Sequence, residues 1–186
     1  MRTSNFFGKK VVVANFAMAI FGWGIGFLWA ANIHVCRHLL IMFNASTGID
    51  FVEEAVGRAT AKAKAAGLNI DFMVKDFFTI GSWDRKFQTI IDSGLFHIFS
   101  GDEVRKAAYL DIVSKLLSDN GRLYILACKK ETGIDAGVNA DEIFETFRER
   151  FIVESLHEFE AETVIDAAEN VPGKQWLSYF AVIKKR

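Results

Sequence analysis

Apolar and charged positions divide this chain into two unequal parts. No Asp, Glu, Lys, Arg or His occurs between Val11 and Ile33, whereas charged residues return at ordinary density from Gly48 onward. The uncharged run reaches the roughly 20 apolar residues that span a bilayer. The break near residues 44–47 therefore predicts a hydrophobic segment over residues 1–45 and a folded domain over residues 46–186.

Beyond the break, short strand patterns alternate with amphipathic helix patterns. A helical pattern begins at Glu53, and Gly67 can supply its stop. Two capping boxes, Ser100 with Glu103 and Asn139 with Glu142, predict the starts of two further helices. Asn120-Gly121 is expected to close the helix that begins at Ser100. Apolar and β-branched runs predict strands over residues 47–50, 70–75, 87–91, 123–127, 151–156 and 176–183. This alternation predicts an α/β fold: a mainly parallel sheet with helices on both faces.

Three successive predicted strands are followed by an acid: Asp50, Asp76 and Asp92. In open parallel sheets, ligands bind beyond the carboxyl ends of the strands, and a carboxylate after the second strand accepts hydrogen bonds from ribose hydroxyls. The pattern indicates a nucleotide-type site. The alternative, that each acid is a solvated turn residue, stays open for any one of them alone.

Four stretches carry a resemblance to a known family. In order along the chain they read "TGIDFVEEAV", "FMVKDFF", "FQTIIDSGLFHIFS" and "LLSDNGRLYILA". They resemble the second to fifth strand units of class I S-adenosylmethionine-dependent methyltransferases of the small-molecule type, over roughly residues 46–186. The resemblance implies a Rossmann-like sheet with an antiparallel C-terminal hairpin, S-adenosylmethionine as cofactor and a small-molecule methyl acceptor.

The resemblance also implies roles at the nucleoside end of the cofactor. Asp50 would hold the ribose, and Phe51 would lie along the adenine. Asp76 would accept a hydrogen bond from the adenine amino group, with Phe77 beside it. The alternative for Phe77, and for Phe78 after it, is a packing role only.

At the other end of the cofactor, the resemblance implies that Asp92, Ser93 and Gly94 shape the floor beneath the methionine part. His97 would face the acceptor as the candidate catalytic residue. The alternative is that His97 is a core or rim histidine. Methyl transfer needs no metal, and the sequence offers no cluster of metal ligands.

The first βα unit expected for this family is atypical. A glycine-rich loop should precede Asp50 by about 20 residues, and the candidate is Gly22-Trp23-Gly24-Ile25-Gly26, whose last glycine lies 24 positions before Asp50. The acid that usually ends the first strand is missing, and only Asn15 is polar there. The stretch "FFGKKVVVANFAMAIFGWGIGF" instead resembles a first membrane span of major facilitator transporters. Two alternatives follow: residues 11–33 span a membrane, or they form a distorted strand, loop and helix.

Composition narrows the class of protein. With 22 basic and 23 acidic residues the net charge is close to zero, so the chain lacks the excess positive charge that attracts nucleic acid. Cys36 and Cys128 lie far apart without a CxxC spacing, which argues against a zinc site or a disulfide scaffold. We therefore expect a cytoplasmic protein, with membrane association through residues 11–33 as the open question. Three hypotheses other than methyl transfer remain open: a non-catalytic or vestigial domain, a membrane-protein fragment with an attached soluble domain, and a nicotinamide-linked oxidoreductase.

Overall fold

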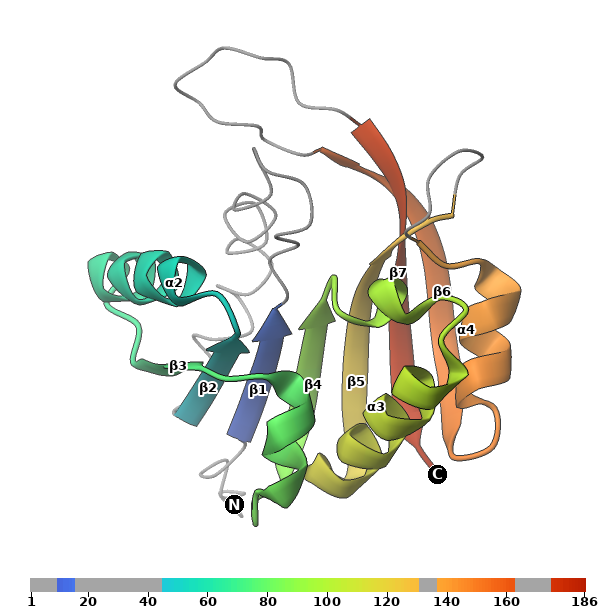
Figure 1. Cartoon of the computed structure of the whole chain (residues 1–186), viewed down its shortest axis with the longest axis horizontal. Helices are drawn as coiled ribbons and strands as arrows, with labels where there is room; N and C mark the ends of the chain where they lie inside the picture. Colours follow the sequence, from blue (N-terminus) through green and yellow to red (C-terminus); the bar gives the residue numbers. More distant parts are fainter. Residues whose placement is uncertain (1–9, 16–44, 131–136, 163–174) are drawn as a thin grey trace, which may run out of the picture.

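The structure, a computed structural model, describes residues 10–15, 45–130, 137–162 and 175–186. These residues form one seven-stranded sheet in the order β3-β2-β1-β4-β5-β7-β6 (Figure 1). The strands are β1 (Lys10–Asn15), β2 (Ala45–Asp50), β3 (Ile70–Val74), β4 (Phe87–Ser93), β5 (Leu117–Cys128), β6 (Phe151–Glu162) and β7 (Gln175–Lys185). The helices are α2 (Glu53–Ala65), α3 (Glu103–Leu116) and α4 (Ala140–Phe147), with short 3-10 helices η2 (Phe77–Ser82) and η3 (Phe96–Phe99).

The pairing confirms the predicted fold class. Strands β3, β2, β1, β4 and β5 pair in parallel, and β7 pairs antiparallel with both β5 and β6. The strand before Asp50 and the strand before Asp76 are parallel neighbours, with Gly48 opposite Phe72. The sheet is therefore Rossmann-like and carries the expected C-terminal antiparallel hairpin.

Helices cover both faces of the sheet for a topological reason. The chain passes through α2 from β2 toward the β3 edge, and through α3 from β4 toward the opposite edge. Right-handed connections that run in opposite directions place their helices on opposite faces. Helix α2 buries Ala59 and Ala63 and is followed by Gly67 at φ +67°, the left-handed stop that the sequence predicted. Helix α3 lies over β5, as Figure 1 shows.

The predicted start of α3 was wrong. Helix α3 begins at Glu103, and Asp102 caps it by accepting a hydrogen bond from the Arg105 N–H at 2.9 Å. The chain at Gly101 has φ +77°, which interrupts the helical backbone after Ser100. Val104, predicted on the apolar face, lies in the first turn and is 80% exposed.

Two further details of the predicted helix ends need correction. Helix α3 ends at Leu116 and the chain enters β5 at once, so Asn120-Gly121 does not close the helix. Asn120, at φ +60°, lies where the register between β4 and β5 shifts. Helix α4 follows Asn139 as predicted, but the Asn139 side chain makes no capping bond, and Glu142 reaches across to other elements.

Of residues 1–45, the structure describes Lys10–Asn15 and Ala45. Lys10–Asn15 forms the central strand β1 between β2 and β4, and Ala45 begins β2. The strand, loop and helix alternative requires such a strand over Val11 to Val13. Residues 16–44, which hold the glycine loop and most of the suggested membrane span, lie outside the described residues, so the division at residue 45 stays a prediction. Among the helices of the described ranges, none is long and apolar enough to cross a membrane.

The core lies between the sheet and the layer formed by η2, η3, α3 and α4. Tyr109 of α3 stacks on Phe77 of η2, with ring centroids 5.2 Å apart, and its ring also meets Phe96 of η3 at 5.5 Å. Phe96 in turn contacts Phe147 of α4 at 5.2 Å. This chain of aromatic contacts joins the segments that follow β3 and β4.

Candidate functional site

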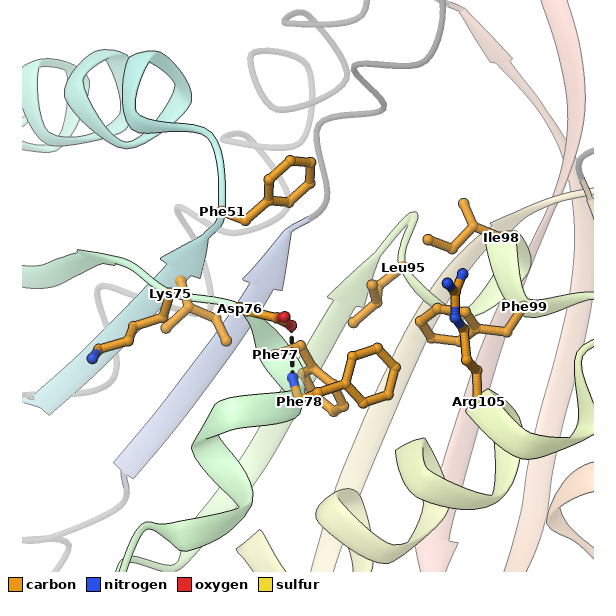
Figure 2. Close-up of a pocket in the computed structure, with 10 residues that line it drawn as sticks. Phe51, Lys75, Asp76, Phe77, Phe78, Leu95, Ile98, Phe99 and Arg105 are labelled. Atoms are coloured by element: carbon orange, nitrogen blue, oxygen red, sulfur yellow. Dashed lines mark hydrogen bonds between the residues drawn. The ribbon is translucent and has the colours of Figure 1, made fainter.

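A cavity of about 270 Å³ opens at the carboxyl ends of β2 and β3. Figure 2 shows Phe51 on one side, Leu95 and Ile98 on the other, and Asp76 between them. The walls are mostly apolar or aromatic, and Lys75, Asp76 and Arg105 are the charged members. The full lining is Ile49, Phe51, Lys75, Asp76, Phe77, Phe78, Leu95, Ile98, Phe99 and Arg105.

Asp76 lines this cavity and is held in place by the start of η2. Its Oδ1 accepts a hydrogen bond from the Phe78 N–H at 2.9 Å, and its carbonyl accepts from Thr79. Within the described residues, Oδ2 of Asp76 and the N–H of Phe77 have no hydrogen-bond partner. The first turn of η2 therefore presents one acceptor and one donor.

Asp50 ends β2 directly beside the cavity. Its side chain is buried, and Oδ1 accepts a hydrogen bond from the Val52 N–H at 2.8 Å, which fixes the carboxylate at the turn into α2. Its carbonyl accepts from the Lys75 N–H at 2.9 Å, and this bond ties the end of β2 to the end of β3. Phe51, the next residue, lines the cavity and is 41% exposed.

The end of β4 is built around a buried acid. Asp92 is 1% exposed and accepts hydrogen bonds from the N–H groups of Leu95 and Phe96, at 2.8 and 3.1 Å, and from the Tyr109 hydroxyl at 2.7 Å. Burial raises the pKa of Asp92 to about 6, although these three hydrogen bonds act in the opposite direction. Gly94, at φ +93°, turns the chain out of the strand. The hydrogen bonds that Asp92 accepts from Leu95 and Phe96 therefore orient the start of η3.

His97 lies on η3 but does not line this cavity. It is 5% exposed, and burial lowers the pKa of His97 to about 4. Its Nδ1 accepts a hydrogen bond from the Cys128 N–H at 3.3 Å. A neutral imidazole that accepts at Nδ1 carries its proton on Nε2, so His97 offers a donor at Nε2 and has its basic nitrogen engaged.

Comparison with known proteins identifies the family. A family model described as a methyltransferase domain matches residues 33–171. The chain belongs to this methyltransferase family. The prediction of a class I S-adenosylmethionine-dependent methyltransferase is thereby confirmed at the level of family and fold.

Curated relatives of this methyltransferase domain include uncharacterized methyltransferases of Schizosaccharomyces pombe. Three of them are each 33% identical to it over 61 residues, a match that covers 33% of this chain and 42% of the relative. This chain thus spans less than half the length of the curated relatives it matches.

Solved structures share the fold. A structure from work titled "Conversion of a Disulfide Bond into a Thioacetal Group during Echinomycin Biosynthesis" has a TM-score of 0.71 and 24% identity, covering 96% of this chain and 76% of that one. The N-methyltransferase NodS from Bradyrhizobium japonicum WM9, in complex with S-adenosyl-L-homocysteine, has a TM-score of 0.66 and 15% identity, covering 95% and 78%.

The structure groups the predicted site residues of the methyltransferase domain in two places. Phe51, Asp76 and Phe77 line the cavity, and Asp50 adjoins it. Asp92 and Ser93 are buried at the end of β4, and His97 is buried beyond it in η3. Their roles toward cofactor and acceptor stay predictions.

Sequence reasoning missed several residues that line the cavity or support it. Phe78 was considered only for packing beside Phe77, and Leu95 directly follows the predicted Gly94. Phe99 and Arg105 carry no local signal, because they reach the cavity through η3 and through the turn from η3 into α3. Tyr109 had a signal: it falls on one helical face with Ile112, Val113 and Leu116, all of them buried.

Proposed function

We propose that this methyltransferase domain binds S-adenosylmethionine in the cavity between β2, η2 and η3 and transfers its methyl group to a small-molecule acceptor. The observation that carries the proposal is the convergence of Phe51, Asp76 and Phe77 on one cavity from the ends of two adjacent parallel strands. The carboxyl ends of such strands are where nucleotide ligands bind in open α/β sheets.

The lining fits the purine end of that cofactor. Adenine presents a donor, its amino group, next to an acceptor, a ring nitrogen. Asp76 Oδ2 can accept and the Phe77 N–H can donate, and the described residues provide neither with another partner. The aromatic and aliphatic walls suit a flat base. When bound, the cofactor supplies an electrophilic methyl group on a sulfonium.

In this proposal Asp50 binds the ribose. Its carboxylate is oriented by the Val52 N–H and lies at the end of the second strand, where an acid accepts hydrogen bonds from ribose hydroxyls. Phe51, half exposed beside it, would lie along the base.

The end of β4 would serve the methionine part and the acceptor. Asp92 holds the start of η3, while Ser93 and Gly94, where the chain leaves the strand, would form the floor beneath the methionine part. His97 would orient the acceptor by donating from Nε2, because its Nδ1 already accepts from Cys128. Holding the acceptor in line with the methyl group supplies much of the rate enhancement for such a displacement.

One observation favours a second candidate, a non-catalytic domain that binds the cofactor only. The basic nitrogen of His97 is engaged, so His97 is not available at Nδ1 to take a proton from an acceptor. Cofactor binding without methyl transfer to any of a panel of small-molecule thiols, amines and hydroxyls would support this candidate.

The test is calorimetric titration with S-adenosyl-L-homocysteine. Leaving the ribose hydroxyls unpaired should cost roughly 1.5 to 3 kcal/mol, so Asp50→Ala should weaken binding about tenfold to a hundredfold. Asp71→Ala, which removes an exposed acid from β3, is the matched control and should bind as the wild type does. No wild-type binding at millimolar ligand would reject the proposed function; unchanged affinity in Asp50→Ala would reject the ribose assignment alone.

A further inference from the structure

One wall of the cavity depends on the short segment between η3 and α3. Ile98 and Phe99 line the cavity just before this segment, and Arg105 lines it just after. The segment itself, residues 100–102, passes through Gly101 at φ +77°. Whatever fixes residues 100–102 therefore also fixes the position of this wall.

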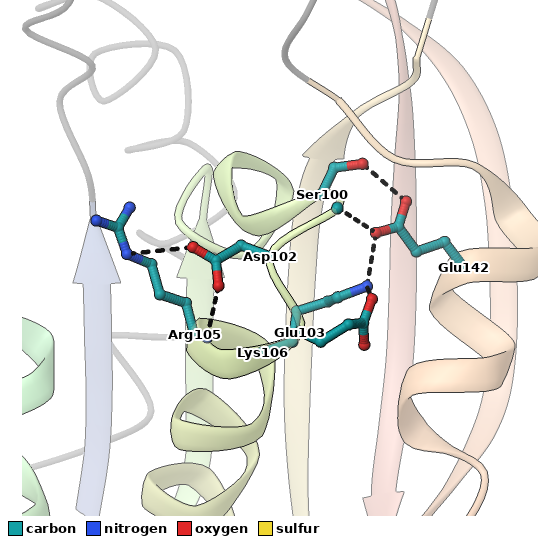
Figure 3. A network of polar contacts seen from close by, with 7 residues as sticks. Ser100, Asp102, Glu103, Arg105, Lys106 and Glu142 are labelled. Carbon is teal, nitrogen blue, oxygen red and sulfur yellow. Dashed lines mark hydrogen bonds and ion pairs between the residues drawn. The ribbon is translucent and has the colours of Figure 1, made fainter.

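A single carboxylate from α4 contacts this segment at two points and the first turn of α3 at a third. Glu142 accepts a hydrogen bond from the Ser100 hydroxyl at 2.9 Å and one from the Gly101 N–H at 3.4 Å. The Lys106 ammonium of α3 donates to the same carboxylate at 3.0 Å. Figure 3 shows Glu142 reaching from α4 to these groups.

The ion pair at the centre of this network is largely buried. Lys106 is 7% exposed and lies between Glu103, at 2.6 Å, and Glu142, at 3.0 Å. The Glu103 side chain is 82% exposed and that of Glu142 is 18% exposed, so Glu142 is the shielded partner. Burial alone would raise the pKa of Glu142, but its hydrogen bonds with Lys106 and Ser100 outweigh burial and lower it. Removing the charge of Glu142 would leave the buried Lys106 ammonium with only the exposed Glu103 as a partner among the described residues, which weakens the compensation of a buried charge.

Helix α4 is itself anchored, so Glu142 has a firm base. The Val138 N–H just before α4 donates to the Cys128 carbonyl at the end of β5, at 2.9 Å. Ile143 and Phe147 of α4 are fully buried. The network therefore connects α4, which is anchored to β5, with the segment between η3 and α3.

We propose that Glu142 is a positioning residue that holds the η3–α3 wall of the cavity and so sets cofactor affinity without touching the cofactor. Glu142 does not line the cavity, while residues on both sides of the segment it holds, Phe99 and Arg105, do. This inference rests on the proposed cofactor site and adds a residue from an element that site does not include.

The experiment compares affinity for S-adenosyl-L-homocysteine with the free energy of unfolding in urea. Glu142→Gln keeps the size of the side chain but removes the charge that faces Lys106. Its dissociation constant should rise roughly three- to tenfold. Glu145→Gln is the matched control on the same helix, because the one ion pair of Glu145 in the described part of the chain is with Arg148, at an exposed site. Its affinity should equal that of the wild type.

A second control separates positioning from general loss of stability. Ile183→Val shortens a fully buried side chain of β7 outside the cavity lining and should cost about 0.5 to 1.5 kcal/mol. Its affinity should match the wild type although its stability falls. An affinity loss in Ile183→Val as large as that in Glu142→Gln at comparable stability would overturn the positioning role.

Ser100→Ala provides an independent arm, because it removes one hydrogen bond to Glu142 and keeps the ion pair. If Glu142→Gln does not fold, Ser100→Ala should still raise the dissociation constant above that of the wild type. If the wild type binds while Glu142→Gln and Ser100→Ala bind within twofold of it, the inference is wrong and the proposed function stands. If the wild type does not bind, both fall.

Discussion

The hydroxyl of Tyr109 donates a 2.7 Å hydrogen bond to the carboxylate of Asp92 inside the core of the domain. Asp92 belongs to β4 and Tyr109 to α3. The same carboxylate accepts from two N–H groups at the start of η3, and the Tyr109 ring stacks on Phe77 at the start of η2. One buried pair therefore supports both the η2 side and the η3 side of the cavity.

Tyr109→Phe should destabilise the domain. The substitution keeps the ring that packs on Phe77 and removes the hydroxyl that donates to a buried carboxylate, a loss worth about 1 to 3 kcal/mol. Urea unfolding at pH 7 measures this free energy. Tyr124→Phe is the control: the Tyr124 ring stacks on Phe180, and its hydroxyl makes no hydrogen bond within the described ranges. Equal stability losses in the two variants would contradict a special role for the Asp92 contact.

The raised pKa of Asp92 predicts a pH dependence with a definite sign. Its ordinary value is 3.8 and its folded value is about 6, so between these pH values the folded chain holds a proton that the unfolded chain releases. The contribution of Asp92 to stability is thus full below pH 3.8 and is lost as pH rises through 6. Asp92→Asn should therefore be more destabilising at pH 5 than at pH 7, by about 1 kcal/mol in urea unfolding.

His97 should show the opposite trend. Its ordinary pKa is 6.5 and its folded value is about 4, so the unfolded chain takes up a proton in this window and the folded chain does not. The contribution of His97 is full above pH 6.5 and is lost as pH falls toward 4. His97→Gln should be less destabilising at pH 5 than at pH 7, by about 2 kcal/mol. Shifts of the same sign in Asp92→Asn and His97→Gln would show that one of the two burial assignments is wrong.

The fold could be predicted from the sequence because its signals are local. Alternating apolar residues such as Ile70, Phe72 and Val74 mark strands, and the spacing of Ala59 and Ala63 marks the buried side of a helix. The helix ends were harder to predict, because the residues of a capping box can also form hydrogen bonds with distant parts of the chain. Ser100 and Glu142 have side chains suited to capping, yet they bond to each other across 42 positions of sequence.

The candidate site could be predicted only in part, for a related reason. Asp50 and Asp76 follow recognisable strands, so their meeting at one edge of the sheet follows from parallel pairing. Phe99 and Arg105 reach the cavity through η3, whose start a buried carboxylate holds, and through the turn from η3 into α3. Whether a carboxylate faces a ligand or the core depends on packing, and Asp92 faces the core.

Gly48 is a position where strand packing allows no side chain. A Cβ atom there would lie 2.3 Å from two ring carbons of Phe72, its partner on β3. Gly48→Ala should destabilise the domain by about 1 to 3 kcal/mol, as overpacking does. Adding Phe72→Leu to this variant should recover part of the loss. Gly57→Ala, in helix α2 with open space around it, should instead stabilise by about 0.5 to 1 kcal/mol. Thermal or urea unfolding of the three variants distinguishes steric exclusion from mere loss of a glycine.

Asp76→Asn should separate the structural use of Asp76 from its proposed use in binding. The amide oxygen of Asn can still accept from the Phe78 N–H, as Oδ1 of Asp76 does at 2.9 Å, because Asn caps helices as well as Asp does. The free energy of unfolding should therefore change by less than about 0.5 kcal/mol.

The other oxygen of Asp76, however, becomes an amide NH₂ that would face the adenine amino group, and two donors cannot pair. Affinity for S-adenosyl-L-homocysteine should fall about tenfold or more in calorimetry. Asp71→Asn, at an exposed position of the same segment, should leave both quantities unchanged. An Asp76→Asn variant that binds as the wild type does would place the adenine elsewhere in the cavity; one that loses stability and affinity together would show that the cap, and not ligand contact, explains the effect.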